Sequence, residues 1–158
     1  MATTQIDARG PRFAATLTTL VLAVALVTSP SAITTTLLVV QAAVFAVGAF
    51  AGVQHTPYAW LFKGLVRPRL APPTATEEPA PPRFAQGIGL VFAAVALVGY
   101  LSGATLLGAI ATGLALGAAF LKAAFGFCLG CEVYLLVRRI APATAKTIAG
   151  HHPVATKG

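Results

Sequence analysis

The residues with the clearest capacity for chemistry are the chain's two cysteines, Cys128 and Cys131. Two cysteines at this spacing can close a disulfide, and such a pair can cycle between dithiol and disulfide. Gly126 and Gly130 predict a break in the helical path and a new helix from about Leu129 to residue 140. Cys128 then lies at the N-terminus of that helix, where the positive end of the helix dipole favours a thiolate. We therefore interpret Cys128 as the nucleophile and Cys131 as the resolving thiol.

Two ionisable side chains could assist this pair. Glu132 directly follows the second cysteine and could accept a proton, although its negative charge opposes a thiolate. His55 could act as an acid or base if the fold brings it beside the cysteines. A simpler interpretation of His55, as a residue at the membrane interface that caps a spanning helix, stays open.

The cysteines also have interpretations without redox chemistry. A free cysteine is a common small apolar residue in buried helices, so the two could serve packing alone. A closed structural zinc site needs four ligands, and only His55 or Glu132 could complete one here. The sequence contains no glycine-rich phosphate loop and no serine-hydrolase elbow. We predict no metal and no cofactor.

The composition points to a membrane. Of the 158 residues, 57% are hydrophobic and 9% are charged, whereas a soluble domain has about 25% charged residues. This excludes a soluble enzyme, a disordered tail and a disulfide-stapled secreted module. The net charge of +7 comes from basic residues beside apolar segments, where such residues set orientation and contact anionic lipid. We predict a lipid bilayer, and not nucleic acid, as the partner of these charges.

Four apolar stretches are long enough to span a bilayer, which takes about 20 residues. They cover 13–28, 32–53, 84–102 and 105–127, and only Lys122 interrupts the last one. Lys122 could snorkel to the interface or face the bundle interior near the cysteines. The first stretch also resembles a signal peptide, but it recurs later in the chain, which a removable leader has no reason to do. We predict an all-α integral membrane protein with four transmembrane helices.

The two halves of the chain repeat each other. The motif Pro-Arg-Phe-Ala and a later Ala-Val-Ala-Leu-Val recur at the same offset, and an Arg-X-Ala-Pro motif recurs one residue out of step. The matching segments are 11–14 with 82–85, 23–27 with 94–98, and 69–72 with 139–142. In the later register Cys128 corresponds to Tyr58.

This repetition predicts the organisation of a single membrane domain over residues 1–158. Repeat one covers 6–72 and repeat two covers 77–142, and a mobile cytoplasmic tail covers 143–158. Because each repeat contains two spans, both repeats have the same orientation, with any pseudo-twofold axis along the membrane normal.

Orientation follows from the basic residues. The short connections at 29–31 and 103–104 contain none, whereas the lysines and arginines fall on the other side. The positive-inside rule then predicts that both termini and the central loop are cytoplasmic. We expect residues 55–66 to form a short interfacial helix, a counterpart to the helix after the fourth span. Residues 70–82 are proline-rich and should form an extended connector.

Three segments carry a resemblance to a known family. They are Ile6–Phe13, Pro82–Gln86 and, most specifically, Phe125–Glu132 (FGFCLGCE). Together they resemble a bacterial, mainly actinobacterial, membrane family catalogued as domain of unknown function 4395, over about residues 6–140. The resemblance implies a small four-span protein of the bacterial cytoplasmic membrane. It also implies a thioredoxin-like or sulfurtransferase partner, without a settled activity.

Two functions remain as hypotheses. In the first, Cys128 and Cys131 carry out thiol–disulfide or sulfur exchange with a soluble cytoplasmic partner. In the second, the protein is a non-enzymatic scaffold or transporter-like subunit with structural cysteines, whose small residues let helices pack closely. A homo-oligomer is open in either case. A cofactor-binding redox subunit is least favoured, because the spans lack paired histidines for haem.

Overall fold

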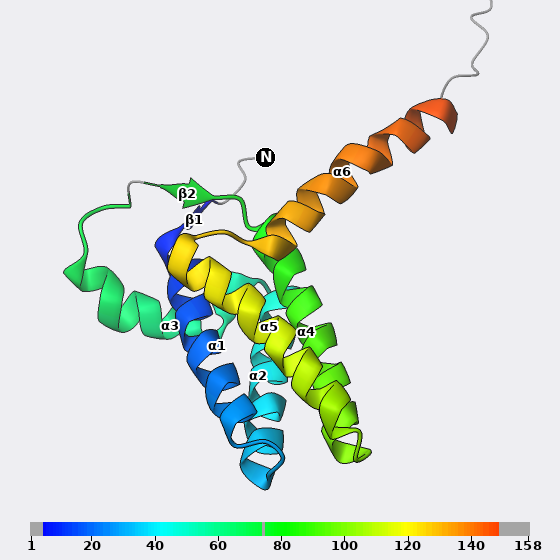
Figure 1. Ribbon diagram of the computed structural model, residues 1–158. Helices are drawn as coiled ribbons and strands as arrows, with labels where there is room; N and C mark the ends of the chain where they lie inside the picture. The colour runs from blue at the N-terminus through cyan, green and yellow to red at the C-terminus, as the bar shows by residue number, and fades with distance from the viewer. Residues whose placement is uncertain (1–4, 74, 149–158) are drawn as a thin grey trace, which may run out of the picture.

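The computed structural model describes residues 5–73 and 75–148, and its main feature is a bundle of four long helices (Figure 1). Each of these helices is long and apolar enough to cross a membrane. They are α1 (Arg9–Val27), α2 (Ala32–Phe50), α4 (Ala80–Leu101) and α5 (Thr105–Phe125). The four predicted apolar helices are therefore confirmed.

The four helices form a ring in the order α1, α2, α4, α5, in which each packs against its two neighbours. Small and branched residues fill the centre of this ring. The buried core comprises Leu22, Ala25, Leu38, Ala96, Ala111 and Ala115. The closest approach joins α4 to α5, where a Cβ added at Gly99 would lie 2.6 Å from the backbone nitrogen of Gly108. Many large apolar side chains face outward instead, as expected for helices in contact with lipid.

Short turns join the helices of each pair at one end of the bundle. Between α1 and α2, the side chain of Ser31 accepts a hydrogen bond from the Thr34 amide at 3.3 Å and caps α2. Thr34 is fully buried, and its hydroxyl donates to the carbonyl of Ala25 at 3.0 Å. The second turn, between α4 and α5, covers residues 102–104. Neither turn carries a charged residue.

The other end of the bundle carries all the remaining elements (Figure 1). The short strands β1 (Ile6–Asp7) and β2 (Thr76–Glu77) directly precede α1 and α4. They pair antiparallel, with Ile6 opposite Glu77. This pairing, which the sequence did not predict, brings the N-termini of α1 and α4 together.

The proline-rich connector differs from the expected extended segment over 70–82. It is extended around β2, but α4 already begins at Ala80. Pro81 and Pro82 lie in the first turn of α4, where the missing amide hydrogens cost nothing because no intrahelical acceptor faces them.

The chain after α2 stays helical along one side of the bundle. It forms the 3₁₀ turn η1 (Val53–His55), helix α3 (Pro57–Leu61), the π-helical turn η2 (Phe62–Val66) and the 3₁₀ turn η3 (Arg67–Arg69). The Thr56 hydroxyl caps α3 by accepting from the Ala59 amide at 3.2 Å. The ring of Phe62 is buried and packs on Phe13 of α1, with centroids 5.7 Å apart.

The last helix, α6 (Leu129–Ile148), begins where the sequence predicts but is longer than expected. It contacts α4 at its start and then projects away from the bundle (Figure 1). The helix continues past the expected end at Ile140, so the first residues of the predicted 143–158 tail belong to it. The remainder of that tail, 149–158, lies outside the described residues.

Candidate thiol–disulfide site

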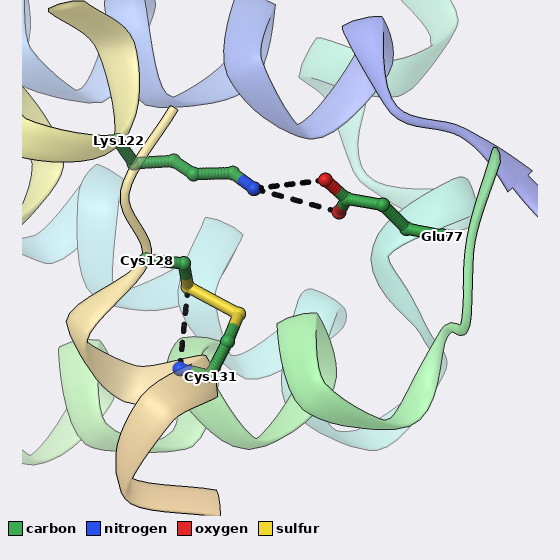
Figure 2. Close-up of a disulfide and its surroundings, with 4 residues drawn as sticks. All are labelled: Glu77, Lys122, Cys128 and Cys131. Carbon is green, nitrogen blue, oxygen red and sulfur yellow. Dashed lines mark hydrogen bonds and ion pairs between the residues drawn. A yellow bond between two sulfur atoms is a disulfide. The ribbon is translucent and has the colours of Figure 1, made fainter. Parts of the chain in front are cut away.

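Cys128 and Cys131 are joined by a disulfide at the start of α6 (Figure 2). Their Cα atoms are 5.1 Å apart, within the range that a disulfide bridges. Both residues are half-buried. The two sulfur atoms therefore lie at the rim of the bundle and not in its core.

A helix break places the first cysteine. Gly126 ends α5 in the left-handed conformation with φ of 71°, which glycine adopts without steric cost. Its amide donates to the carbonyl of Lys122 at 3.0 Å, and the Phe127 amide donates to Leu121 at 3.3 Å. With the helix closed in this way, the chain turns and α6 starts at Leu129.

Cys128 caps the N-terminus of α6. Its carbonyl accepts from the Glu132 amide at 3.0 Å, and its Sγ accepts from the Cys131 amide at 3.3 Å (Figure 2). Ser, Thr, Asp and Asn cap helices through the same kind of contact. An amide donor and the helix dipole both favour negative charge on this sulfur. The predicted position of Cys128 at a helix N-terminus is confirmed.

Close packing holds the disulfide segment against α4. A Cβ added at Gly130 would lie 2.6 Å from the Cβ of Ala85, so only glycine lets the backbones come this near. One turn further along α6, the ring of Tyr134 packs on Phe84, with centroids 5.6 Å apart. These contacts fix the start of α6 relative to the bundle.

A cavity of about 410 Å³ lies beside the disulfide, and Cys128 forms part of its wall. The rest of the wall comes mainly from α1, α4 and α5 and is largely apolar. The polar residues that line it are Thr18, Gln86 and Lys122. Ligand pockets usually measure about 300–1,000 Å³ and combine apolar walls with a few polar groups. This cavity fits that description.

Lys122 faces the cavity and forms an ion pair with the connector. Its Nζ donates to Oε1 and Oε2 of Glu77 at 3.1 and 3.4 Å (Figure 2). The Lys122 side chain is only 12% exposed. Of its two predicted orientations, the structure therefore has the inward one. The sequence did not predict the pairing, because Glu77 belongs to a connector remote from α5 in the chain.

The structure does not join the other two candidate residues to the sulfur atoms. Glu132 lies in the first turn of α6 and is exposed. His55 is also exposed, at the end of η1, and its Nδ1 is 2.9 Å from the carbonyl oxygen of Ala51. Within residues 5–73 and 75–148, no three His, Cys, Asp or Glu side chains gather closely enough to hold a metal ion.

Tyr58, the predicted counterpart of Cys128, lies in α3. Its hydroxyl donates to Oε1 of Gln41 at 2.9 Å, and Nε2 of Gln41 donates to the hydroxyl of Thr18 at 3.3 Å. Gln41 is fully buried, and burial raises the pKa of Tyr58 above its ordinary value. Gln41 is the single amide side chain of α2, which is the signal from which this network could have been predicted.

Two arginines cap the helices that lead into these segments. Arg12 donates to the carbonyls of Ala123 and Ala124 at 2.9 and 2.8 Å. Arg83 donates to the carbonyl of Phe50 at 3.0 Å and also contacts that of Ala49. The last carbonyls of a helix have no intrahelical donor. Arg12 thus holds the end of α5, just before the disulfide segment.

Comparison with known proteins places the chain in a family. A family model described as Domain of unknown function matches residues 6–139. No curated protein and no solved structure matches the chain. The matched range includes the four long helices and the disulfide segment. The chain therefore belongs to the family described as Domain of unknown function (DUF4395).

Proposed function

We propose that this protein exchanges electrons or sulfur between its Cys128–Cys131 pair and a soluble partner at the membrane surface. The observation that carries the proposal is the half-buried disulfide at the N-terminus of α6, with the Cys131 amide donating to Sγ of Cys128. A disulfide in this position can be reached by another thiol. The amide and the helix dipole stabilise the thiolate that reduction releases.

The exchange is balanced by two electrons and two protons. A thiolate of the partner attacks one sulfur of the disulfide, and the other sulfur leaves as a thiolate. A second thiol of the partner then attacks the mixed disulfide, which leaves a dithiol on this protein and a disulfide on the partner. A partner that carries a persulfide would react with the same two residues. The Cys128 thiolate first takes the outer sulfur from the partner. The Cys131 thiolate then attacks Sγ of Cys128, the outer sulfur leaves as hydrosulfide, and the disulfide re-forms.

We further propose that the disulfide end of the bundle and both termini face the cytoplasm of a bacterial cell. The charge distribution supports this orientation, because the basic residues gather at the disulfide end and the turns at the other end carry none. The basic residues concerned are Arg9, Arg12, Lys63, Arg67, Arg69, Arg83, Lys122, Arg138 and Arg139. A thioredoxin-like or sulfurtransferase partner, as the family resemblance implies, fits this side.

The two-repeat arrangement is part of the proposal. In the register of the Pro-Arg-Phe-Ala motifs, Glu77 is the counterpart of Ile6, and these two residues pair with each other, as counterparts do at a twofold axis. Arg12 and Arg83 are also counterparts, and each caps the second long helix of the other repeat. We propose that the segments after α2 and α5 both lie at the membrane interface, with basic and apolar residues interleaved.

The test is a redox titration in native membrane vesicles. Thiol trapping against graded mixtures of reduced and oxidised dithiothreitol should show one reversible two-electron transition in the wild type and none in Cys128→Ser or Cys131→Ser. The Cys131→Ser variant should also retain the partner as a mixed disulfide that a reductant releases. Leu135→Ser is the matched control, because it makes an equivalent change on an exposed part of α6 and keeps both cysteines.

Cysteines that neither oxidise nor reduce across the titration would contradict the proposal. If they reacted with an alkylating reagent only after denaturation, the result would favour the alternative function. That alternative is a non-enzymatic scaffold or transporter-like subunit in which the cysteines are structural.

A further inference from the structure

We propose that the cavity beside Cys128 binds a lipid-soluble quinone and that this quinone accepts electrons from the Cys128–Cys131 dithiol. The inference rests on the proposed function, because a pair that does not cycle has no electrons to pass on. A protein that reduces or oxidises a soluble partner repeatedly needs a second reactant to restore its starting state. The cavity indicates the chemistry of that reactant.

The position of the cavity selects a molecule that dissolves in the bilayer. Its walls belong mainly to α1, α4 and α5, which are apolar enough to span a membrane, and the start of α6 closes it beside the disulfide. Leu114 lines it from the middle of α5 and is 56% exposed on the outer face of the bundle. Part of the cavity wall is therefore formed by a residue that also faces outward, and small residues such as Gly89 and Ala118 give the cavity room.

The polar groups of the cavity match a ring that alternates between carbonyl and hydroxyl. Lys122 donates two hydrogen bonds to Glu77, and its ammonium has a third N–H that can donate to a carbonyl oxygen. Gln86 also lines the cavity, and its Oε1 is buried without a hydrogen-bond partner among the described residues. Rotation of the Gln86 side chain, which packs against Gly48, would bring this buried oxygen to the cavity, where a hydroxyl of the reduced ring can donate to it. A plain acyl chain would leave it unpaired at a cost.

The cysteine pair supplies the matching number of electrons. In the forward step, the two S–H bonds of Cys128 and Cys131 break and the S–S bond forms. Two electrons and two protons pass to the quinone, and both of its carbonyls become hydroxyls. Cys128 lines the cavity itself, so the sulfur that the helix dipole activates is the one beside the ring.

The test uses purified protein in detergent with decylubiquinone as the probe. Protein reduced with dithiothreitol and then desalted is mixed with the quinone without oxygen. Ultraviolet absorbance reports quinol, and maleimide labelling reports the remaining thiols. We expect one quinol for each pair of thiols lost. Ala118→Leu should slow the reaction at least tenfold by filling the cavity, whereas Ala94→Leu, the same change at an exposed position on α4, should not slow it.

Dithiothreitol exchange separates the possible failures. If the disulfide cycles with dithiothreitol but the wild type does not reduce decylubiquinone, the quinone site is wrong and the proposed function stands. A rate in Ala118→Leu equal to that of the wild type would show that the reaction does not use the cavity. If neither reagent changes the redox state, the proposed function fails as well.

A second variant covers the case in which Ala118→Leu does not fold. Gln86→Leu keeps the approximate size of the side chain and removes its amide. We expect the KM for decylubiquinone to rise about tenfold, which corresponds to the loss of one hydrogen bond to a buried group, with dithiothreitol exchange unchanged. An unchanged KM in a folded Gln86→Leu protein would contradict the polar recognition proposed here.

Discussion

The segments that follow α2 and α5 lie at the same end of the bundle, but their side chains interact with the bundle in different ways. After α2, Tyr58 reaches inward and completes a hydrogen-bonded chain with Gln41 and Thr18. After α5, the predicted counterpart of Tyr58 is Cys128, which has a much shorter side chain. A cavity of about 410 Å³ lies beside it. The segment after α2 borders a cavity of its own, of about 540 Å³, so the two segments differ in what Tyr58 and Cys128 do: Tyr58 is hydrogen-bonded into the bundle, and Cys128 carries the disulfide.

The two segments therefore differ in what they contribute to the protein. A buried polar network whose members bond to one another holds helices in place. A cavity lowers stability because its walls lose packing contacts, but it leaves room for another molecule. The segment after α2 therefore supports the packing of the helices through Tyr58, while the segment after α5 carries the disulfide beside a cavity.

The largest expected effect comes from Gly130→Ala. The new Cβ would lie 2.6 and 2.7 Å from the Cβ and Cα of Ala85, and backbone atoms cannot move aside. We expect a loss of about 1–3 kcal/mol in the free energy of unfolding, the usual cost of overpacking, and a shifted redox midpoint as α6 moves away from α4. The control is Gly64→Ala in the segment after α2, where no atom lies within 4 Å. Unfolding in detergent measures the free energy of both variants, and thiol trapping measures their redox midpoints. Equal losses of unfolding free energy in Gly130→Ala and Gly64→Ala would contradict the comparison.

A smaller effect is expected for Tyr58→Phe, which removes the donor to Gln41. We expect a loss of about 1 kcal/mol in unfolding free energy, since a buried acceptor loses its partner. Tyr134→Phe is the control, because the described contacts of Tyr134 are made by its ring. Chemical unfolding of both variants in detergent measures the difference.

Tyr58 also predicts a pH dependence. Burial raises its pKa in the folded protein above the value of about 10 in an unfolded chain. Its contribution to stability is therefore complete below pH 10 and is lost as the pH rises through the folded pKa. Wild type should lose stability more steeply than Tyr58→Phe above about pH 10. Parallel curves for the two proteins would contradict this assignment.

The smallest stability effects are expected for Arg12→Met and Arg83→Met, which each remove a cap from a helix end. Both arginine contacts are exposed, so each variant should lose about 0.5–1 kcal/mol in unfolding free energy. Only Arg12→Met should also shift the redox midpoint of the disulfide, because Arg12 holds the end of α5 next to Gly126. Unfolding curves and thiol titrations on both variants test this, and a shift in Arg83→Met would contradict the division between the two regions.

The sequence predicted the features that depend on local chemistry. The four long helices follow from apolar length, and the start of α6 follows from the glycines on either side of Cys128. Contacts between distant segments could not be predicted in this way, such as the pair of Lys122 with Glu77. The prediction of an extended connector up to residue 82 was wrong at Pro81 and Pro82. A proline-rich composition is typical of extended chain, but the first turn of a helix also accepts proline. The role of His55 stays a prediction.

The strand pair has a consequence for the origin of the chain. Ile6 pairs with Glu77, which is its counterpart in the proposed two-repeat arrangement, as it would pair with Ile6 of a second copy in a symmetric dimer. A half-length ancestor with two spans would therefore assemble through the same backbone hydrogen bonds. Under this proposal, gene duplication would require only a link between two such copies, a role that the proline-rich connector would fill. Once fused, such halves would no longer have to be identical, so one could keep a tyrosine while the other acquired a cysteine pair.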